Sequence, residues 1–333
     1  MSPSRLGRRL SSSLRSAALG ALGAFTFGCS GVEAPPAGGP DAAAMPGDRE
    51  APTVIGATPS AGAIGVAADA TVTITFSEPM DAASVAAAYA SAELPADQVT
   101  LRWSAAGDVL TITPAAPLAY ATGVGVDPAA VPARRYALTI GAAAADRAGN
   151  PLAAPFALEF ATKKRLTTGM PATAELTRVA RNGVLLAVAN PMWMGDNNTG
   201  ETYQSFVTFD LTRLPAGIAL EAATLEAQQQ APSGNPYSMG ALLAEHVSYA
   251  SAAVAPMTLP LASLGPFSTN ATLETKRLDV TGAARDDLAN RAARANRSQY
   301  RLRFALATNG NTATDTAVFA KDSLRLALAY LAD

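Results

Sequence analysis

The chain has 333 residues, with 25 Lys and Arg, 27 Asp and Glu, one His and one Cys. One cysteine excludes an internal disulfide and any metal site built from several cysteines, and one histidine excludes a multi-histidine metal centre. Without the four arginines that precede Cys29, 21 basic residues remain against 27 acidic ones, a net charge of −6, so we expect no nucleic-acid partner.

Residues 1–28 have the layout of an export signal. Arginines come first, a small apolar run from Ala17 to Phe27 follows, and Gly28 precedes Cys29. The run is too short and too rich in alanine for a membrane span. The Gly28–Cys29 junction resembles the signal of bacterial lipoproteins, which implies diacylglycerol modification of the Cys29 thiol. The alternative is a plain secretory signal with an incidental cysteine.

Residues 29–50 are predicted to be a flexible tether, because Pro, Gly and Ala dominate and no apolar period is present. With an acyl group on Cys29, this tether would hold a folded domain away from a membrane. Ser30 and Gly31 lack the Asp that retains some lipoproteins on the inner membrane. We therefore expect an exported, lipid-anchored protein of the outer membrane or cell surface.

Residues 51–163 are predicted to form a first β-sandwich. Val72, Ile74 and Phe76 alternate with threonines, and Gly- or Pro-containing turns separate this run from later ones. The segments "VTITFSEPMD", "YALTI", "ADRAGNPL" and "FALEFAT" resemble, in order and spacing, the bacterial Ig-like domain first noted in S-layer proteins. The resemblance implies a spacer without a catalytic site.

Glu78 and Asp81 lie close enough in this domain to form a catalytic carboxylate pair. The local pattern favours a structural interpretation instead: Pro79 ends the strand, and Asp81 is placed to cap a short helix. The segment from Asp146 to Asn150 is predicted to be a hairpin turn. We therefore expect no chemistry in the first domain.

Residues 165–333 are predicted to form a second β-sandwich with one short helix. Alternating runs include "YRLRF" and "SLRLALAYL". Between them, Val280, Ala284 and Leu288 make one apolar stripe at helical spacing, and Thr281 is predicted to be the N-cap. The predicted fold class is therefore all-β, an Ig-like sandwich followed by a second sandwich.

The segments "YQSFVTFDLTRLPAG", "LDVTGAARDDL" and "YRLRFALAT" resemble the DNRLRE or disaggregatase-related domain. That domain is a sandwich of jelly-roll type, related to carbohydrate-binding modules that recognise alginate-like polymers. The resemblance implies a polysaccharide ligand for residues 165–333.

Aromatic rings can stack on sugar faces, and guanidinium groups can pair with uronic carboxylates. Arg301 and Arg303 alternate with Leu302 and Phe304, which predicts that both arginines point outward from one face. A solvated strand face would show the same pattern, and strand aromatics are mostly core. Trp193, which lies between two methionines, is expected to be buried. The candidate ligand-binding residues are Trp193, Tyr203, Arg178, Arg181, Arg301 and Arg303.

The loop "GDNNTGE" is rich in oxygen donors. Asp196, Asn198 and Glu201 are candidate ligands for a structural Ca²⁺ ion, which takes six to eight oxygens. An Asx-rich hairpin turn without metal is the alternative. No other cofactor is expected.

His246 is the one histidine available to a Ser/His/Asp triad, and no nucleophile motif such as G-x-S-x-G accompanies it. We expect a non-catalytic, lipid-anchored surface protein whose Ig-like spacer presents a carbohydrate-binding sandwich. The alternatives are a structural or assembly component of the envelope that binds protein, and a polysaccharide-active enzyme.

Overall fold

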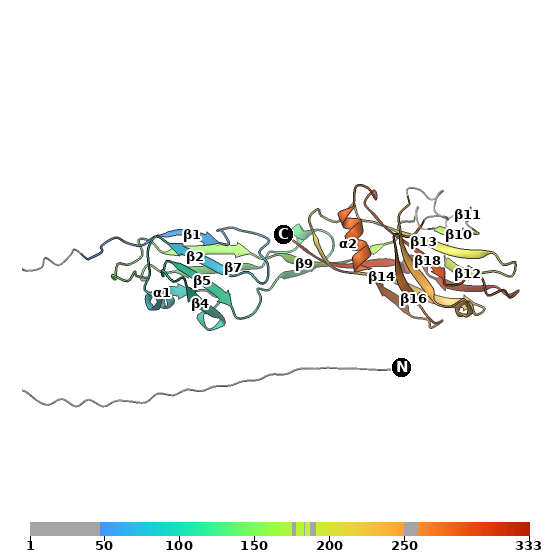
Figure 1. The fold of residues 1–333 in the computed structure, drawn as a ribbon, viewed down its shortest axis with the longest axis horizontal. Coiled ribbons are helices and arrows are strands. Elements are labelled where there is room, and N and C mark those ends of the chain that lie inside the picture. The colour runs from blue at the N-terminus through green and yellow to red at the C-terminus, as the bar shows by residue number, and fades with distance from the viewer. Residues whose placement is uncertain (1–46, 175–177, 183, 187–190, 250–258) are drawn as a thin grey trace, which may run out of the picture. The chain divides into compact units, whose positions relative to one another are not determined.

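The computed structural model describes residues 47–174, 178–182, 184–186, 191–249 and 259–333 (Figure 1). Cys29 and most of the predicted tether therefore lie outside the described residues. Strands dominate, and the described α-helices are α1 (Ala82–Ala88) and α2 (Thr281–Ala289), which confirms the predicted all-β class. No helix in these ranges has the length and apolarity needed to cross a membrane.

Two sheets form the first sandwich, with strand orders β1-β2-β5-β4 and β3-β7-β8. Both sheets contribute side chains to one core, including Ile74, Leu110 and Ile140, which are fully buried. The predicted alternation is confirmed, because the side chains that point inward are those of the apolar positions. The strands are β1 (Val54–Thr58), β2 (Val72–Phe76), β3 (Tyr89–Ala90), β4 (Val99–Trp103), β5 (Val109–Pro114), β7 (Arg135–Ile140) and β8 (Phe156–Ala161).

A long loop of the first domain packs on the second. Strand β6 (Ala121–Val124) pairs in parallel with β9 (Lys164–Pro171), the first strand of the second sandwich. Val131, further along this loop, is buried in the second domain's apolar core. The Tyr330 hydroxyl donates to the Gly125 carbonyl at 3.2 Å. The loop therefore supplies apolar and hydrogen-bonding contacts in addition to the covalent connection.

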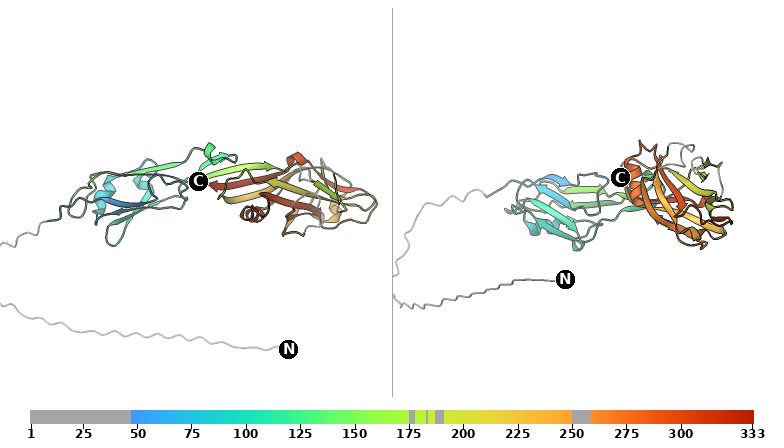
Figure 2. Two further views of the ribbon diagram at one scale, coloured as in Figure 1. Left: turned by 90° about the horizontal axis from the view of Figure 1, so that it is seen from above. Right: turned by 45° about the vertical axis from the view of Figure 1, so that its right-hand side comes forward.

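The second sandwich is built mainly from antiparallel strands, in the order β16-β15-β18-β13-β12-β19-β14-β20-β9. Figure 2 shows that the orange and red strands near the C-terminus lie beside yellow-green strands from the middle of the chain, as the pairing of β18 with β13 requires. The additional strands here are β10 (Arg178–Arg181), β11 (Val184–Leu185), β12 (Met192–Asp196), β13 (Thr202–Asp210), β14 (Ala219–Ser233), β15 (Leu242–Val247), β16 (Ala262–Ser268), β17 (Thr275–Asp279), β18 (Arg297–Phe304), β19 (Asp315–Phe319) and β20 (Arg325–Ala332).

Strand β14 closes this sandwich, because its two halves belong to different layers. Its first part pairs with β17 and β20. Its last part pairs with β19 from Gln229 onward, and this pairing contains a register shift between Gln230 and Ser233. Irregular pairing of this kind lets one strand turn a corner between sheets. The core between the layers includes Phe209, Tyr300 and Phe319. Short 3₁₀ helices in the two domains span Ala96–Gln98, Pro128–Ala130, Pro236–Met239 and Lys321–Ser323.

Helix α2 covers one end of the second core, and its apolar stripe lies as predicted. Val280 and Ala284 are buried, and Leu288 packs against the same cluster. The predicted N-cap is wrong: Val280 occupies that position, and Thr281 is the first helical residue. The Thr281 hydroxyl instead accepts from the Ala223 N–H of β14 at 2.9 Å. This tertiary hydrogen bond occupies the side chain that was expected to cap the helix.

Candidate functional site

A small pocket joins two of the predicted ligand residues. Tyr203 at the start of β13 and Arg303 near the end of β18 line the same cavity of about 140 Å³. These two strands are neighbours in the sheet, and their register, which pairs Ser205 with Leu302, brings Tyr203 and Arg303 to the same end of the strand pair. The other lining residues are Gly195, Thr202, Gln204, Phe304, Ala305, Leu306 and Ala307.

Trp193 extends the aromatic part of this site. Its ring meets the ring of Tyr203 edge to face, with centroids 6.3 Å apart and planes at 81°. Both side chains are partly exposed, whereas the flanking Met192 and Met194 are buried in the core. The expectation that Trp193 is buried is therefore wrong: the period of two places it on the opposite face from the methionines, where part of the indole remains accessible to solvent.

Glu245 pairs with Arg301 and Arg303, two of the arginines on β18. Its carboxylate accepts from Arg301 Nε at 2.5 Å and from Arg303 Nη2 at 2.8 Å. Burial alone would raise the pKa of Glu245, but hydrogen bonds from Arg303 and Arg301, together with their charges, hold that pKa below its ordinary value. The carboxylate therefore remains ionised and pairs with both cations.

Arg301 and Arg303 share one face of β18, as predicted, but this face is not an open basic strip. Arg301 is only 9% exposed, and its cross-strand partner Phe206 is fully buried. Arg303 is more accessible, with 32% of its side chain exposed. Of the pair, Arg303 is the one placed to reach a ligand.

The other two predicted arginines lie on β10, beside β13. Arg181 is exposed and is the register partner of Tyr203, so it belongs to the same region. Its guanidinium lies 3.6 Å from the Glu201 carboxylate. The backbone of Arg178 pairs with Phe206, while its side chain lies outside the described part of the structure.

The predicted calcium loop contains a hairpin turn organised by Asn197. The Asn197 side-chain oxygen accepts from the backbone N–H groups of Thr199 and Glu201, at 3.0 and 2.9 Å. Glu201 directs its carboxylate to Asn197 and Arg181. Asn198 is exposed and Asp196 is fully buried. The three predicted ligands therefore have different surroundings, and only Asp196 lies inside the fold.

Asp196 instead faces Asp315, which the sequence reasoning missed. The two residues are register partners on β12 and β19, and Asp315 is 2% exposed. Hydrogen bonds from the Asn309 side chain and the Asn235 backbone hold the pKa of Asp315 below its ordinary value. Asp315 could have been found from the sequence, because it ends a second Asx-rich segment, "TNGNTATD".

His246 lies in a buried network whose residue types match a triad. Its Nε2 lies 2.8 Å from Asp287 Oδ1, and the Ser298 hydroxyl lies 2.6 Å from Asp287 Oδ2. Arg294 pairs with the same carboxylate. Asp287 thus stands between His246 and Ser298, so the serine proton points to the carboxylate rather than to the imidazole that would have to accept it.

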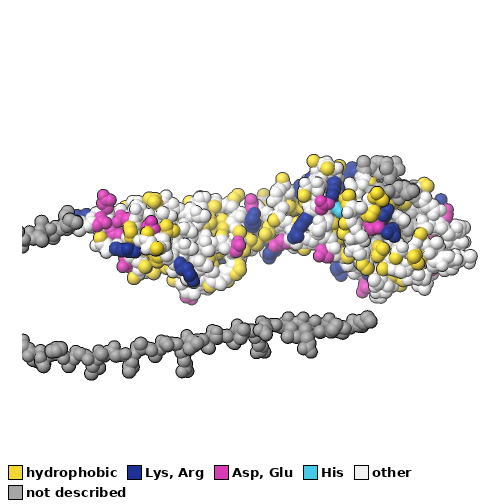
Figure 3. Space-filling model, in the orientation of Figure 1, with side chains coloured by type: hydrophobic (Ala, Val, Ile, Leu, Met, Phe, Trp, Pro, Cys, Tyr) yellow, Lys and Arg dark blue, Asp and Glu magenta, His cyan; other side chains and the backbone are white. Residues whose placement is uncertain are grey.

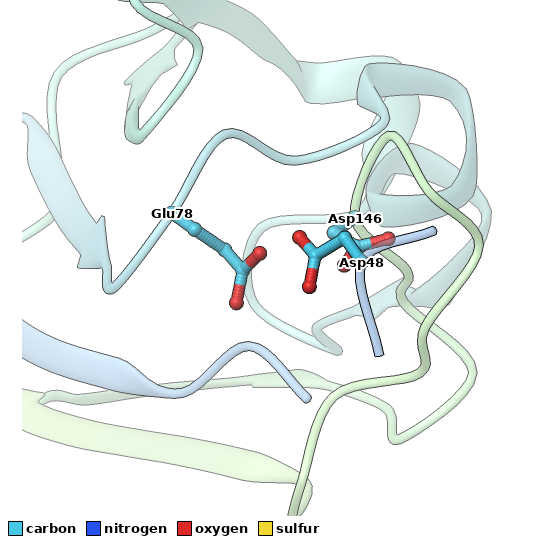
Figure 4. A group of neighbouring side chains, drawn as sticks. All are labelled: Asp48, Glu78 and Asp146. Carbon is cyan, nitrogen blue, oxygen red and sulfur yellow. The ribbon is translucent and has the colours of Figure 1, made fainter. Parts of the chain in front are cut away.

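The first domain carries an acidic cluster of Asp48, Glu78 and Asp146 (Figure 4). Acidic side chains are also visible beside the first described residues in Figure 3. Burial and the charges of Asp48 and Asp146 raise the pKa of Glu78. Asp146 accepts from the N–H groups of Ala148 and Asn150, each at 2.8 Å, which confirms the predicted turn. The sequence reasoning had assigned Asp48 to the tether and missed the cluster.

Asp81 has the predicted capping role. Its side chain accepts from the Ser84 N–H at 2.7 Å at the start of α1. Glu78 therefore faces Asp48 and Asp146 across the turn, while Asp81 caps the helix. Glu78 and Asp81 do not form a carboxylate pair.

A larger cavity of about 520 Å³ lies elsewhere in the second domain. Its described lining includes Asp210 and Arg297 but no aromatic side chain. It therefore lacks the flat apolar face on which a sugar ring could stack. The pocket at Tyr203 and Arg303 is smaller but is lined by both an aromatic and a cationic side chain.

Residues 48–162 match the family model described as the bacterial Ig-like domain. This part of the chain is a bacterial Ig-like domain. Its two-sheet sandwich agrees with the resemblance read from "VTITFSEPMD" and the segments that follow it. The resemblance of residues 165–333 to the DNRLRE domain remains a prediction.

A search of curated proteins finds no match. Solved structures similar to this chain include an L,D-transpeptidase from Mycobacterium smegmatis, with 18% identity and a TM-score of 0.25 over 57% of this chain and 68% of that chain. Domains 1–6 of the surface layer protein SbsC share 12% identity, with a TM-score of 0.23 over 69% of this chain and 32% of that chain.

A third similar structure is the SGBP-B protein of the Bacteroides ovatus mixed-linkage glucan utilization locus, solved with a mixed-linkage heptasaccharide. It shares 13% identity, with a TM-score of 0.20 over 80% of this chain and 53% of that chain. At TM-scores this low, the three likenesses carry no functional argument.

Proposed function

We propose that this chain is an exported, non-catalytic cell-surface protein whose Ig-like domain presents a carbohydrate-binding β-sandwich. The observation that carries the proposal is the pocket shared by Tyr203 and Arg303, with the Trp193 ring packed against that of Tyr203. An aromatic face next to a guanidinium matches a sugar ring that bears a carboxylate. The first ligand class is therefore a uronic-acid polymer.

Arg303 retains donors for such a ligand. A guanidinium has five N–H donors, and three hydrogen bonds to protein acceptors are found here, two to Glu245 and one to the Phe304 carbonyl. Glu245 fixes the plane of the guanidinium without using all its hydrogens. A pre-oriented group loses little conformational entropy when a ligand binds.

The experiment is titration of the mature chain with polyuronates and with a neutral glucan of similar length. We expect Tyr203→Ala and Arg303→Ala each to weaken polyuronate binding about tenfold or more. Arg102→Ala is the matched control for loss of a positive charge, because Arg102 is exposed on β4 of the Ig-like domain. Absence of binding to any polymer by the wild-type chain would favour the structural or assembly role instead.

The anchor in this proposal is Cys29, acylated after removal of residues 1–28. The basic and apolar layout before Gly28 and the Pro- and Gly-rich segment after Cys29 support it. Mass spectrometry of the mature N-terminus tests it, with a diacylglycerol-modified Cys29 as the expected species. An unmodified cysteine, or a chain that retains residues 1–28, would contradict the anchor and leave the pocket proposal standing.

A further inference from the structure

Two buried carboxylates face each other at the ends of β12 and β19. Asp196 and Asp315 are direct antiparallel partners, and they are 0% and 2% exposed. Like charges placed opposite one another destabilise a sheet, and burial increases the cost because water no longer screens them. This arrangement therefore requires compensation.

The described residues supply no cationic partner to either carboxylate. The other buried carboxylates of the second domain are treated differently: Glu245 pairs with Arg301 and Arg303, and Asp287 pairs with Arg294. Asp196 and Asp315 form no ion pair with a described Lys, Arg or His side chain. The fold thus pairs buried carboxylates with cations elsewhere, whereas here Asp315 is held only by neutral donors, the Asn235 N–H and the side-chain amides of Asn309 and Asn311.

One oxygen of the pair has no partner at all within the described structure. Asp196 Oδ1 is buried and makes no hydrogen bond, although Oδ2 accepts from the Asn309 N–H at 3.2 Å. A buried carboxylate oxygen without a hydrogen-bond partner destabilises the fold unless something binds it. This atom is the independent sign of a missing ligand.

Two glycines, Gly195 and Gly234, pack directly against Asp315. A Cβ on Gly234 would lie 2.1 Å from Asp315 Oδ1, and a Cβ on Gly195 would lie 2.0 Å from the Asp315 carbonyl oxygen. Both glycines also have positive φ. Any other residue at either position would displace Asp315, so both are suited to a tightly positioned acid.

We propose that Asp196 and Asp315 together bind one divalent cation of the hard, oxygen-preferring class, with Ca²⁺ as the first choice. Two carboxylates supply the charge, and amide or carbonyl oxygens of the Asx-rich β18–β19 connection, together with water, are the kinds of ligand that complete such a site. The site keeps Asp196 from the sequence-based set but replaces Asn198 and Glu201 with Asp315 from a distant strand.

The test is calorimetric titration of the EDTA-stripped mature chain with CaCl₂, beside thermal unfolding with and without the ion. We expect one Ca²⁺ per chain, and a melting temperature higher by about 5 °C near saturation. Asp196→Asn should abolish this binding. Glu78→Gln, which alters the acidic cluster of the Ig-like domain, should leave it intact.

Asp196→Asn also gives a readout that a purely structural aspartate would not produce. Without Ca²⁺ the variant should melt above wild type, because it relieves the repulsion; with Ca²⁺ the order should reverse. If the variant fails to fold, the decisive result is a rise of the melting temperature with Ca²⁺ that is the same in wild type and in Glu78→Gln. No saturable binding of Ca²⁺ by wild type, or loss of binding in Glu78→Gln rather than in Asp196→Asn, would overturn the proposal.

Discussion

Glu245 on β15 and Arg301 on β18 are direct cross-strand partners, and the guanidinium Nε lies 2.5 Å from the carboxylate. Arg303, two residues further along β18, shares the same carboxylate. Glu245 thus determines the position of Arg303 at the pocket and neutralises Arg301 inside the sheet. One buried acid connects the stability of the second sandwich to its proposed binding site.

Removing this acid should destabilise the fold and alter its response to acid. Breaking a buried ion pair by removing one partner costs about 3 to 5 kcal/mol, so Glu245→Gln should lower the unfolding free energy at neutral pH by about that amount. The pKa of Glu245 is lowered in the folded state, so its contribution is present above the ordinary value of 4.5 and is lost as the pH falls through the folded value.

The measurement is denaturant unfolding of wild type and Glu245→Gln at neutral pH and at several pH values below 4.5. The difference between the two proteins should shrink as the pH falls. Asp322→Asn is a suitable control, because Asp322 is exposed in the last 3₁₀ helix. A difference that stays constant down to the lowest pH would contradict the assigned role.

Most of the fold was predictable because its strands alternate. The inward positions of β2, such as Ile74, follow from a period of two. The same period explains why Trp193 points away from its flanking methionines, although their apolar character led to the expectation that it is buried. The depth of Arg301 was not predictable, since a strand pattern gives the face on which a side chain lies but not what covers that face. The prediction of Thr281 as N-cap was wrong for a related reason: the sequence pattern does not show that the Ala223 N–H of β14 binds the same hydroxyl.

The triad-like group around His246 should be structural. The Ser298 hydroxyl has one proton, which it donates to Asp287, while burial raises the pKa of Tyr300 and keeps that phenol protonated. We expect Ser298→Ala to lower the unfolding free energy by about 1 to 3 kcal/mol. A serine-directed fluorophosphonate probe should leave the wild-type chain unlabelled. Labelling that disappears in Ser298→Ala would instead support the enzyme alternative.

The acidic residues of "SEPMD" should respond to mutation in opposite directions. Asp81→Ala removes the side-chain cap of α1 and should cost about 1 kcal/mol of unfolding free energy. Glu78→Gln relieves repulsion from Asp48 and Asp146 and should hold or raise stability at neutral pH. Thermal unfolding of both variants checks this. Equal losses in the two would mean that Glu78 and Asp81 act together after all.

Sites assembled from distant strands account for what the sequence could not reveal. Asp196 and Asp315 are more than a hundred positions apart, and only the register of β12 with β19 places them opposite each other. Asp48 joins Glu78 and Asp146 in the same way, through tertiary contact rather than spacing. Local spacing drew attention to Asn198 and Glu201, which are close to Asp196 in sequence but have other surroundings.

The proposed cation and the proposed sugar pocket share one segment of chain. The β18–β19 connection contributes Ala305, Leu306 and Ala307 to the pocket. A few residues later, Asn309 and Asn311 donate to the carboxylate of Asp315, at 2.6 and 2.7 Å. An ion bound at Asp315 should therefore order the pocket wall, and its removal should cost affinity at the pocket.

We accordingly expect polyuronate to bind about tenfold more weakly in EDTA than in saturating Ca²⁺, a coupling of ordinary size between two sites. In Asp196→Asn the affinity should be the same in both conditions and close to that of the stripped wild type. Glu78→Gln should behave as wild type. Equal polymer affinity of the wild-type chain with and without Ca²⁺, despite calorimetric binding of the ion, would show that the two sites are independent.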